Sequence, residues 1–380
     1  MKILRIIARL NIGGPARNAV LLAEGLSQRT EIASSSLDKL GTSRNDNTWD
    51  GQGSALNNWE TVLVCGEIGE GEGDMMWLAR EKGIEPVIIP ELGRKLSFIN
   101  DCKAFWKIYR VIRREKPDII HTHTAKAGTL GRMAAVLYNA MQMCSRPNLF
   151  TNRLHGQGSV SNKTVIVHTF HGHVLYGYFG KIKSWVFLWI EKILSLFTDK
   201  IITVSGSLKE ELVEKFRMAS ENKVSVVELG FELGGLLKLP IRENSDCVNI
   251  GIVGRLVPIK NHKMFLRVVK RITEIASAPA AHRNDNGVKF IIIGDGELRQ
   301  ELENYARELG VEDIVEFRGW IKDAAEIYRD LDIVVLTSLN EGTPVSIIES
   351  MSAGRTVVAT NVGGVKDIIE DGKSGYLVDP

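Results

Sequence analysis

Short hydrophobic runs alternate with longer stretches of helical periodicity along the whole chain. Most of the runs are rich in Val and Ile and have no polar residue at every second position, which is typical of strands buried on both faces of a parallel sheet. Their alternation with helical stretches of about ten or more residues predicts βαβ units. The expected strands are KILRIIA, TVLVCG, PVIIP, DIIHTH, TVIVHTFHG, KIITVS and VSVVELG, followed by VNIGIVG, VKFIIIG, DIVEFRG, DIVVLTS, RTVVAT and GYLV.

A polar stretch with two glycines and a proline, GGLLKLPIRENSDC, separates the two groups of runs. The strand rhythm restarts after it, so we predict a domain over residues 1–235, a linker over 236–247 and a second domain over 248–380. The fold class is therefore α/β, with two doubly wound, Rossmann-like domains. Ligands of such sheets bind beyond the carboxyl ends of the strands, which places the expected site in the cleft between the domains.

Three polar segments interrupt the rhythm and are interpreted as surface loops or insertions whose role the sequence leaves open. They cover residues 34–60, 141–163 and about 276–287 and are rich in Ser, Asn, Gly and Asp. The chain ends at GYLVDP, a strand and a turn, although a parallel strand normally returns through a helix. We therefore expect the closing helices to be absent, as in a truncated version of a longer protein.

Composition and charge exclude several classes of protein. The 380 residues are 44% hydrophobic and 25% charged, which is normal for a globular protein. The net charge of +2 gives no reason to expect a nucleic acid partner. The N-terminal MKILRIIARL is interrupted by two arginines and lacks a cleavage site, so we expect a cytoplasmic protein. The four cysteines are scattered without a CxxC pair and predict free thiols: Cys65, Cys102, Cys144 and Cys247.

The most apolar segment is SWVFLWIEKILSLF, which is too short and too charged to span a bilayer. We expect a buried helix that packs Trp185, Phe187, Leu188 and Ile190 into the core. The alternative is an interfacial helix that contacts the inner face of a membrane.

Two acids with seven residues between them, Glu341 and Glu349, mark the stretch NEGTPVSIIESMSAG. Pro344 suits the start of a helix and Gly354 its end. The free N–H groups of residues 342–345 would then face the cleft. Glu349 would lie about one and a half turns inside, where its carboxylate needs partners such as the two hydroxyls of a ribose. Alternatively, the helix dipole alone favours both acids.

Two cations follow the first strand of the second half, in VGRLVPIKNH. Arg255 and Lys260 would project from the carboxyl edge of the sheet, where a guanidinium fork and an ammonium suit a diphosphate. Solvated surface charges are the alternative interpretation.

Glycine turns follow two other strands. In LNIGGPARNAV, Gly13 and Gly14 allow the backbone to approach a ligand, although the GxGxxG fingerprint is missing and a plain tight turn is the alternative. In IIIGDGELRQEL, the segment from Gly294 to Gly296 makes a turn before a helix, and a purely structural role is equally open.

Five of the eight histidines follow two strands of the first half: His121, His123, His168, His171 and His173. Their spacing admits a zinc site, but no acidic or cysteine ligand accompanies them. We predict contacts with sugar hydroxyls or phosphate for some of them, core positions for others, and no metal.

Together these motifs resemble the family 4 retaining glycosyltransferases, which have the GT-B fold. The E-x7-E spacing in its context is specific, whereas the glycine loop alone is not. The resemblance covers nearly all of the chain outside the three insertions. The matching stretches are GGPARNAVLLAEGL, DIIHTHTAKAGTLGRMAA, VHTFHGHVLYGYFG, TDKIITVSGSLKEEL, GIVGRLVPIKNH, IIIGDGELRQEL, VEFRGW and the segment from Glu341 to Pro380.

The resemblance implies a role for each matching residue. The expected catalytic residues hold the donor diphosphate and sugar near the reacting centre: Arg255, Lys260, Glu341 and His171. The expected donor-binding residues include the ribose-binding acid and the loop that contacts the base: Glu349, Gly14, Gly342, Thr343, Pro344, Gly294, Arg318 and Gly319. On the acceptor side the resemblance implies His123 and Lys126.

The implied reaction moves a sugar, with retained configuration, from a nucleotide diphosphate sugar, most often UDP-linked, to an acceptor hydroxyl. The first domain would take a saccharide or lipid-linked acceptor of surface polysaccharide or glycolipid assembly, the second would bind the donor, and no cofactor or metal is needed. Two alternatives stay open: a nucleotide-sugar epimerase, and a catalytically silent interaction subunit with the same fold.

Overall fold

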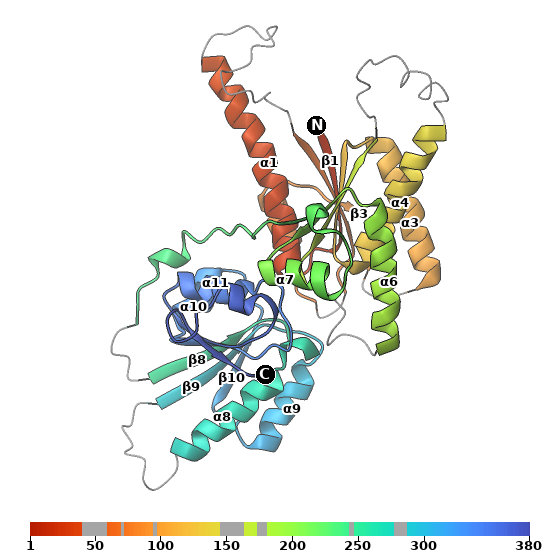
Figure 1. The fold of residues 1–380 in the computed structure, drawn as a ribbon. Helices are drawn as coiled ribbons and strands as arrows, with labels where there is room; N and C mark the ends of the chain where they lie inside the picture. The colour runs from red at the N-terminus through yellow and green to blue at the C-terminus, as the bar shows by residue number, and fades with distance from the viewer. Residues whose placement is uncertain are drawn as a thin grey trace.

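The computed structural model of the protein describes residues 1–39, 59–69, 72–93, 97–144, 163–172, 181–242, 247–276 and 287–380. Within these residues the chain forms two parallel β-sheets, one from each half of the sequence, with helices on both faces (Figure 1). Each expected hydrophobic run is a strand. The predicted α/β class, with two doubly wound sheets, is therefore confirmed.

As far as the structure describes it, the first sheet has seven strands in the order β3-β2-β1-β4-β5-β6-β7, and all these pairs are parallel. Its strands are β1 (Lys2–Arg9), β2 (Glu60–Gly66), β3 (Val87–Ile88), β4 (Ile119–His123), β5 (Val165–Phe170), β6 (Lys200–Thr203) and β7 (Val224–Val226). In the described residues of this half the α-helices are α1 (Gly14–Lys39), α2 (Met76–Glu81), α3 (Phe98–Glu115), α4 (Ala125–Cys144), α6 (Lys181–Phe197) and α7 (Gly206–Glu210). The short helical turns that the structure describes here are η1 (Pro90–Leu92), η3 (Glu211–Lys215) and η4 (Glu221–Lys223).

The second sheet, over residues 247–276 and 287–380, has six parallel strands in the order β10-β9-β8-β11-β12-β13. Its strands are β8 (Cys247–Val253), β9 (Gly287–Ile293), β10 (Val315–Gly319), β11 (Ile333–Leu336), β12 (Thr356–Thr360) and β13 (Tyr376–Val378). The helices are α8 (His262–Ala276), α9 (Arg299–Leu309), α10 (Ala324–Arg329) and α11 (Val345–Ser352), with the short turns η5 (Leu236–Lys238), η6 (Pro258–Lys260) and η7 (Gly363–Asp367). The order reverses direction beside β1 and beside β8, and such switch points are where doubly wound sheets bind ligands.

Strand β1 shows why the hydrophobic runs of the sequence contain no alternating polar residues. Leu4 and Ile6 pack into one hydrophobic cluster with α3 and α4, whereas Ile7 packs into another beneath α1. All three side chains are at most 1% exposed. Both faces of the strand are thus buried, so neither face carries alternating polar residues.

Two of the three predicted insertions begin later than the sequence indicated. Helix α1 continues through residues 34–39, and α4 continues through residues 141–144. The reason is that neither segment contains Gly or Pro, so nothing in the chain breaks the helix there. The other parts of 34–60 and 141–163, apart from residues next to β2 and β5, and residues 277–286 lie outside the described residues.

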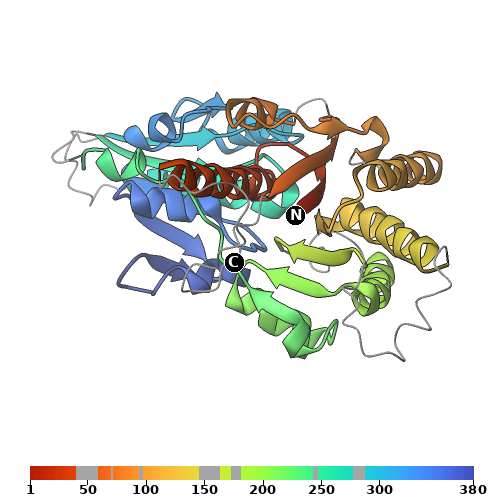
Figure 2. The same cartoon turned by 90° about the horizontal axis from the view of Figure 1, so that it is seen from above.

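The prediction that α6 packs Trp185 into the core is wrong, and Ile190 is only partly buried. Trp185 is 62% exposed and Trp189 is 49% exposed, while Phe187 and Leu188 are only partly buried against the first half of the molecule. One stripe of the helix faces the protein, and there Glu191 is 5% exposed and pairs with Arg132 of α4 at 2.6 Å. Figure 2 shows α3, α4 and α6 side by side along one edge of the molecule, with α6 at the end of the row.

The end of the predicted linker is held against the second sheet. Arg242 forms an ion pair with Asp332 at 3.2 Å, and the Arg355 guanidinium donates to the carbonyl of Pro240 at 3.1 Å. These contacts lie before β11, at the opposite end of that strand from the cleft. The two sheets are built from residues 2–226 and 247–378, while the domain boundaries themselves stay a prediction.

Candidate active site

A cavity of about 430 Å³ lies between the two halves, where the carboxyl ends of both sheets meet. Most of its wall comes from loops that follow strands β1, β5, β8, β9, β10 and β11. Residues that the sequence singled out form much of the wall: Gly14, His171, Arg255, Lys260, Gly294, Glu341, Gly342, Thr343, Pro344 and Glu349. The fold therefore brings together positions that are more than three hundred residues apart in the chain.

Glu349 lies on the short helix α11, which has Pro344 as its N-cap and ends before Gly354. Its carboxylate belongs to a residue only 7% exposed and therefore needs partners. The hydroxyl of Tyr328 donates to Oε2 at 2.9 Å, and Nη1 of Arg17 donates to Oε1. Burial and the neighbouring carboxylate of Glu349 raise the pKa of Tyr328 well above its usual value, so the phenol stays protonated and donates.

Arg255 and Lys260 both reach the cavity from the segment that follows β8. Within the described part of the chain, the Arg255 side chain has no hydrogen-bond or ion-pair partner, which leaves its guanidinium available for an anion. Lys260 forms an ion pair with Glu341 at 2.5 Å, and the Ser338 hydroxyl donates to the same carboxylate oxygen at 2.6 Å. The loop acid is thus held by a cation and a hydroxyl, a pairing that the sequence did not predict.

Backbone segments approach each other so closely around the cavity that two positions require glycine. Gly294 has a φ of +131°, and a Cβ there would lie 2.0 Å from the carbonyl oxygen of Gly254. A Cβ on Gly342 would lie 1.9 Å from the carbonyl oxygen of His171, so this glycine lets the loop before α11 touch the other half of the molecule. The Thr343 hydroxyl also reaches from the second half to the first, where it donates to the carbonyl of Val204 at 3.1 Å.

The histidines of the first half form a buried cluster beside the cavity. His123 Nδ1 and His171 Nε2 are 2.9 Å apart, so one ring donates to the other. His121 accepts from the buried Arg5 at 2.8 Å, and His168 shares a hydrogen bond with the Thr122 hydroxyl at 2.8 Å. Within the described residues no group of three metal-binding side chains forms a metal site, and His173 lies outside them.

Burial keeps these imidazoles neutral. It lowers the pKa of His171 to about 4, and burial lowers the pKa values of His121, His123 and His168 well below the usual range. His262 in the second half is also buried, which lowers its pKa to about 3.

The histidine pKa values predict a protein that loses stability in mild acid. Because the unfolded chain binds protons near pH 6.5 and the folded chain does not, the free energy of unfolding is at its full value above that pH. It falls as the pH drops from 6.5 toward 4, by roughly 1.4 kcal/mol per pH unit for each of these histidines. Urea unfolding at pH values from 7.5 to 5 checks this, and a flat free energy over that interval would mean that the folded chain protonates them freely.

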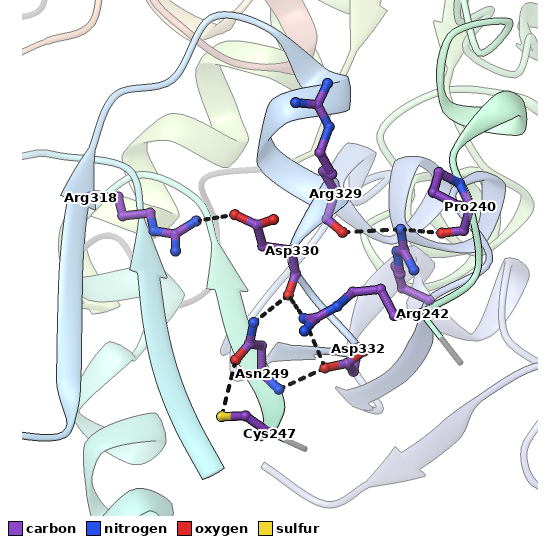
Figure 3. A network of polar contacts seen from close by, with 9 residues as sticks. Pro240, Arg242, Cys247, Asn249, Arg318, Arg329, Asp330 and Asp332 are labelled. Atoms are coloured by element: carbon purple, nitrogen blue, oxygen red, sulfur yellow. Dashed lines mark hydrogen bonds and ion pairs between the residues drawn. The ribbon is translucent and has the colours of Figure 1, made fainter. Parts of the chain in front are cut away.

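Four of the residues expected to bind the donor or the acceptor do not line the cavity. Arg318 forms ion pairs with Glu316 at 3.0 Å and with Asp330 at 3.2 Å, the second of which is drawn in Figure 3. Gly319, with a φ of +70°, accepts a backbone hydrogen bond from Gly294 at 2.8 Å and so supports the cavity wall from behind. The base-contacting role expected for this pair stays a prediction.

The two residues expected on the acceptor side also lie behind the wall. His123 is fully buried and touches the cavity only through His171. Lys126 pairs with Asp101 at 2.7 Å and donates to the carbonyl of Gly93 at 2.9 Å, which turns its ammonium toward α3. A direct acceptor contact for either residue stays a prediction.

Several cavity residues could not be predicted from the sequence. Arg17 stands inside the quoted stretch GGPARN, but its position gave no sign that it would meet an acid from the other half. Trp320 directly follows Gly319 and Lys322 comes two positions later, so the sequence indicated this segment but not these two side chains. Trp77 and Glu191 line the cavity without any motif that could have indicated them.

Comparison with known proteins gives matches over both halves of the chain. Residues 57–234 match the family model for Glycosyltransferase Family 4, and residues 247–380 match the one for Glycosyl transferases group 1. A UDP-Gal:alpha-D-GlcNAc-diphosphoundecaprenol alpha-1,3-galactosyltransferase of Escherichia coli is 30% identical over 311 residues, which are 79% of this chain and 72% of that protein. The capsular polysaccharide biosynthesis glycosyltransferase CapM of Staphylococcus aureus is 25% identical over 77% of this chain and 71% of its own length.

Solved structures share the fold over the whole chain. HepE from Anabaena, crystallised in complex with UDP and glucose, has a TM-score of 0.68 at 18% identity, over 100% of this chain and 86% of that one. Sucrose-phosphate synthase from Thermosynechococcus elongatus has a TM-score of 0.66 at 16% identity, with the same coverage. Both likenesses concern the arrangement of the two sheets.

Proposed function

Since this chain belongs to the glycosyltransferases of family 4, we propose that it transfers a sugar from a UDP-linked donor to a saccharide or lipid-linked acceptor with retained configuration. The observation that carries the proposal is the cavity in which Glu349, Arg255 and Lys260 meet between the two sheets. A carboxylate for ribose hydroxyls and two cations for a diphosphate are the groups that a nucleotide diphosphate sugar requires.

The positions of these groups give the donor an orientation. The ribose would lie toward Glu349 and the diphosphate toward Arg255 and Lys260, near the start of α11. The N-terminus of α1 points to the same place, because Gly14 lies against Val345, with an added Cβ only 3.2 Å from its methyl group. Helix N-termini present free N–H groups and a partial positive charge, which favour a diphosphate. We propose that these groups meet the diphosphate charge without a bound metal ion.

The charges of the cavity acids favour retention by attack on the leaving-group face. Glu191, Glu341 and Glu349 line the cavity, and each is paired with a cation, respectively Arg132, Lys260 and Arg17. A carboxylate held by a cation is a poor nucleophile for a double displacement. In the proposed mechanism the acceptor hydroxyl therefore attacks directly, and a phosphate oxygen of the donor takes its proton while Arg255 and Lys260 stabilise the leaving diphosphate.

A transfer assay tests the proposal. The purified chain is given UDP-linked hexoses and N-acetylhexosamines, one at a time, with saccharide and lipid-diphosphate-linked saccharide acceptors. We expect one donor to give a glycosylated product whose anomeric configuration by NMR equals that of the donor. Inverted product would contradict the mechanism. Hydrogen exchange or epimerisation of the donor without transfer would instead favour the epimerase interpretation.

We further propose that α6 brings the enzyme to an anionic membrane surface. In the described residues no helix has the length and hydropathy needed to cross a bilayer. However, α6 exposes Trp185 and Trp189 on its outer side. The ammonium nitrogen of Lys192 lies 5.7 Å from the centroid of the Trp189 ring. Tryptophan and lysine together suit the interface of a bilayer with anionic headgroups. The inner side of the same helix carries Glu191 on the cavity wall, so a lipid-linked acceptor at this surface would lie close to the site.

The double variant Trp185→Ser/Trp189→Ser tests the membrane contact. We expect its partition onto vesicles of phosphatidylglycerol and phosphatidylethanolamine to fall at least about tenfold, because two large apolar side chains no longer leave water. Leu237→Ser is the matched control, since this residue is 70% exposed on the second half of the molecule. Equal flotation of the wild type and the double variant would rule out α6 as the contact.

A further inference from the structure

We propose that Arg17 is a donor-binding residue that exchanges partners: it holds Glu349 in the empty enzyme and passes to the donor diphosphate when the ribose takes the carboxylate. The proposal rests on the proposed function, because it needs a nucleotide diphosphate in the cavity. The sequence motifs do not assign this arginine to the donor.

The two partners of Glu349 approach its carboxylate from opposite sides. Tyr328 is fully buried and does not form part of the cavity wall, so its hydroxyl reaches Oε2 from the core. The Arg17 side chain is 28% exposed and lines the cavity, so its guanidinium covers Oε1 from the open side. The side from which a ribose would approach Glu349 is therefore the side that Arg17 occupies.

Ribose binding and the Arg17 contact compete for the same oxygen. A ribose diol offers two donors, and a carboxylate accepts both best when each oxygen is accessible. Tyr328 can keep its bond to Oε2 from behind, since each carboxylate oxygen accepts more than one hydrogen bond. The bulky guanidinium on Oε1 lies in the way and has to leave.

The diphosphate of the bound donor is the anion that can take the released guanidinium, because the other two carboxylates that the structure describes in the cavity, Glu191 and Glu341, already pair with Arg132 and Lys260. Arg17 belongs to the first turn of α1, whose N-terminal Gly14 lies against the start of α11. This is the place to which the helix N-termini, Arg255 and Lys260 direct the diphosphate. A guanidinium binds phosphate oxygens through two parallel N–H groups, so the exchange replaces one charge-assisted contact with another.

The exchange also gives the empty enzyme an interdomain contact. Arg17 and Glu349 stand 332 positions apart and join the two halves of the molecule. When the nucleotide leaves, the carboxylate and the guanidinium become available to each other again. The contact then competes with the departing product for both groups, which favours its release.

The Arg17→Gln variant tests the exchange. Its affinities for a nucleoside and for the corresponding diphosphate distinguish the exchange from an Arg17 that only orients Glu349 or only competes with the ligand. A panel of UDP, GDP, ADP and CDP first identifies the diphosphate that binds the wild type, and ligand-observed NMR then measures that diphosphate and its nucleoside. For the variant we expect weaker diphosphate binding, by about tenfold or more, because a charge-assisted contact is lost. We expect the nucleoside to bind as well as before or several-fold more tightly, because nothing competes for Glu349. Arg17→Lys should recover part of the diphosphate affinity.

The control is Arg271→Gln, which removes an exposed arginine that is ion-paired with Glu274 at 3.4 Å and lies outside the cavity. If Arg17→Gln weakens the nucleoside and the diphosphate equally, Arg17 only orients Glu349 and the exchange is refuted. If it strengthens both, Arg17 is a simple competitor and the exchange is refuted as well. A wild-type chain that binds none of the four diphosphates would instead overturn the proposed function, and the exchange with it.

Discussion

The Lys260→Ala variant is expected to lose about a hundredfold or more in kcat, while the KM for the donor changes far less. The negative charge on the leaving diphosphate grows as the bond to the sugar breaks, so a fixed ammonium stabilises the transition state more than the bound donor. Lys260 lies on the cavity wall, next to the loop that precedes α11. Steady-state kinetics with the identified donor and acceptor give both constants.

Two comparisons make this prediction specific. Lys263→Ala removes a partly exposed lysine three positions later, which pairs with Glu301 at 2.5 Å outside the cavity, and should leave both constants unchanged. Lys260→Arg keeps a cation beside Glu341 and should retain more of kcat than the alanine variant. If Lys260→Ala raised only KM, the lysine would serve ground-state binding, and an unchanged kcat would remove it from the chemistry.

Glu349→Gln is expected to raise the KM for the donor about 10- to 100-fold, with a smaller effect on kcat. The substitution keeps the shape of the side chain but removes the charge that strengthens hydrogen bonds from the ribose hydroxyls, an effect of about 1.5–3 kcal/mol. It also leaves Arg17 without its carboxylate and Tyr328 facing a weaker acceptor. Donor titration by calorimetry, beside kinetics, separates the loss of binding from any loss of chemistry.

The matched control for this variant is Glu326→Gln on α10. Glu326 is exposed, lies two positions before Tyr328 and does not line the cavity. It should leave the donor affinity and the melting temperature as they are. Donor binding by Glu349→Gln that equals that of the wild type would show that the ribose lies elsewhere.

The fold could be predicted because the strands carry their burial in their own residues. Both faces of β1 and its neighbours are covered, so each strand is a nearly unbroken apolar run, and the spacing of the runs leaves room for a helix between them. Both ends of α11 could also be predicted, since Pro344 favours the start of a helix and Gly354 its end through local backbone preferences. Such signals need no knowledge of the rest of the molecule.

Local signals could not predict which side chains are buried or which distant residues pair with each other. The apolar content of α6 does not say which of its side chains will find a neighbour, so Trp185 was wrongly expected in the core. The pair of Arg17 and Glu349 depends on how the two sheets face each other. Similarly, Lys126 follows the expected strand β4, but the neighbouring Asp101 on α3 turns its ammonium away from the cavity.

The most direct test of the central claim is a crystal structure of the protein with UDP bound. We expect the diphosphate to lie within hydrogen-bonding distance of Arg255 and Lys260, and both ribose hydroxyls to donate to the carboxylate of Glu349. A nucleotide bound outside the cavity, or one in the cavity whose ribose and phosphates contact none of these three side chains, would contradict it.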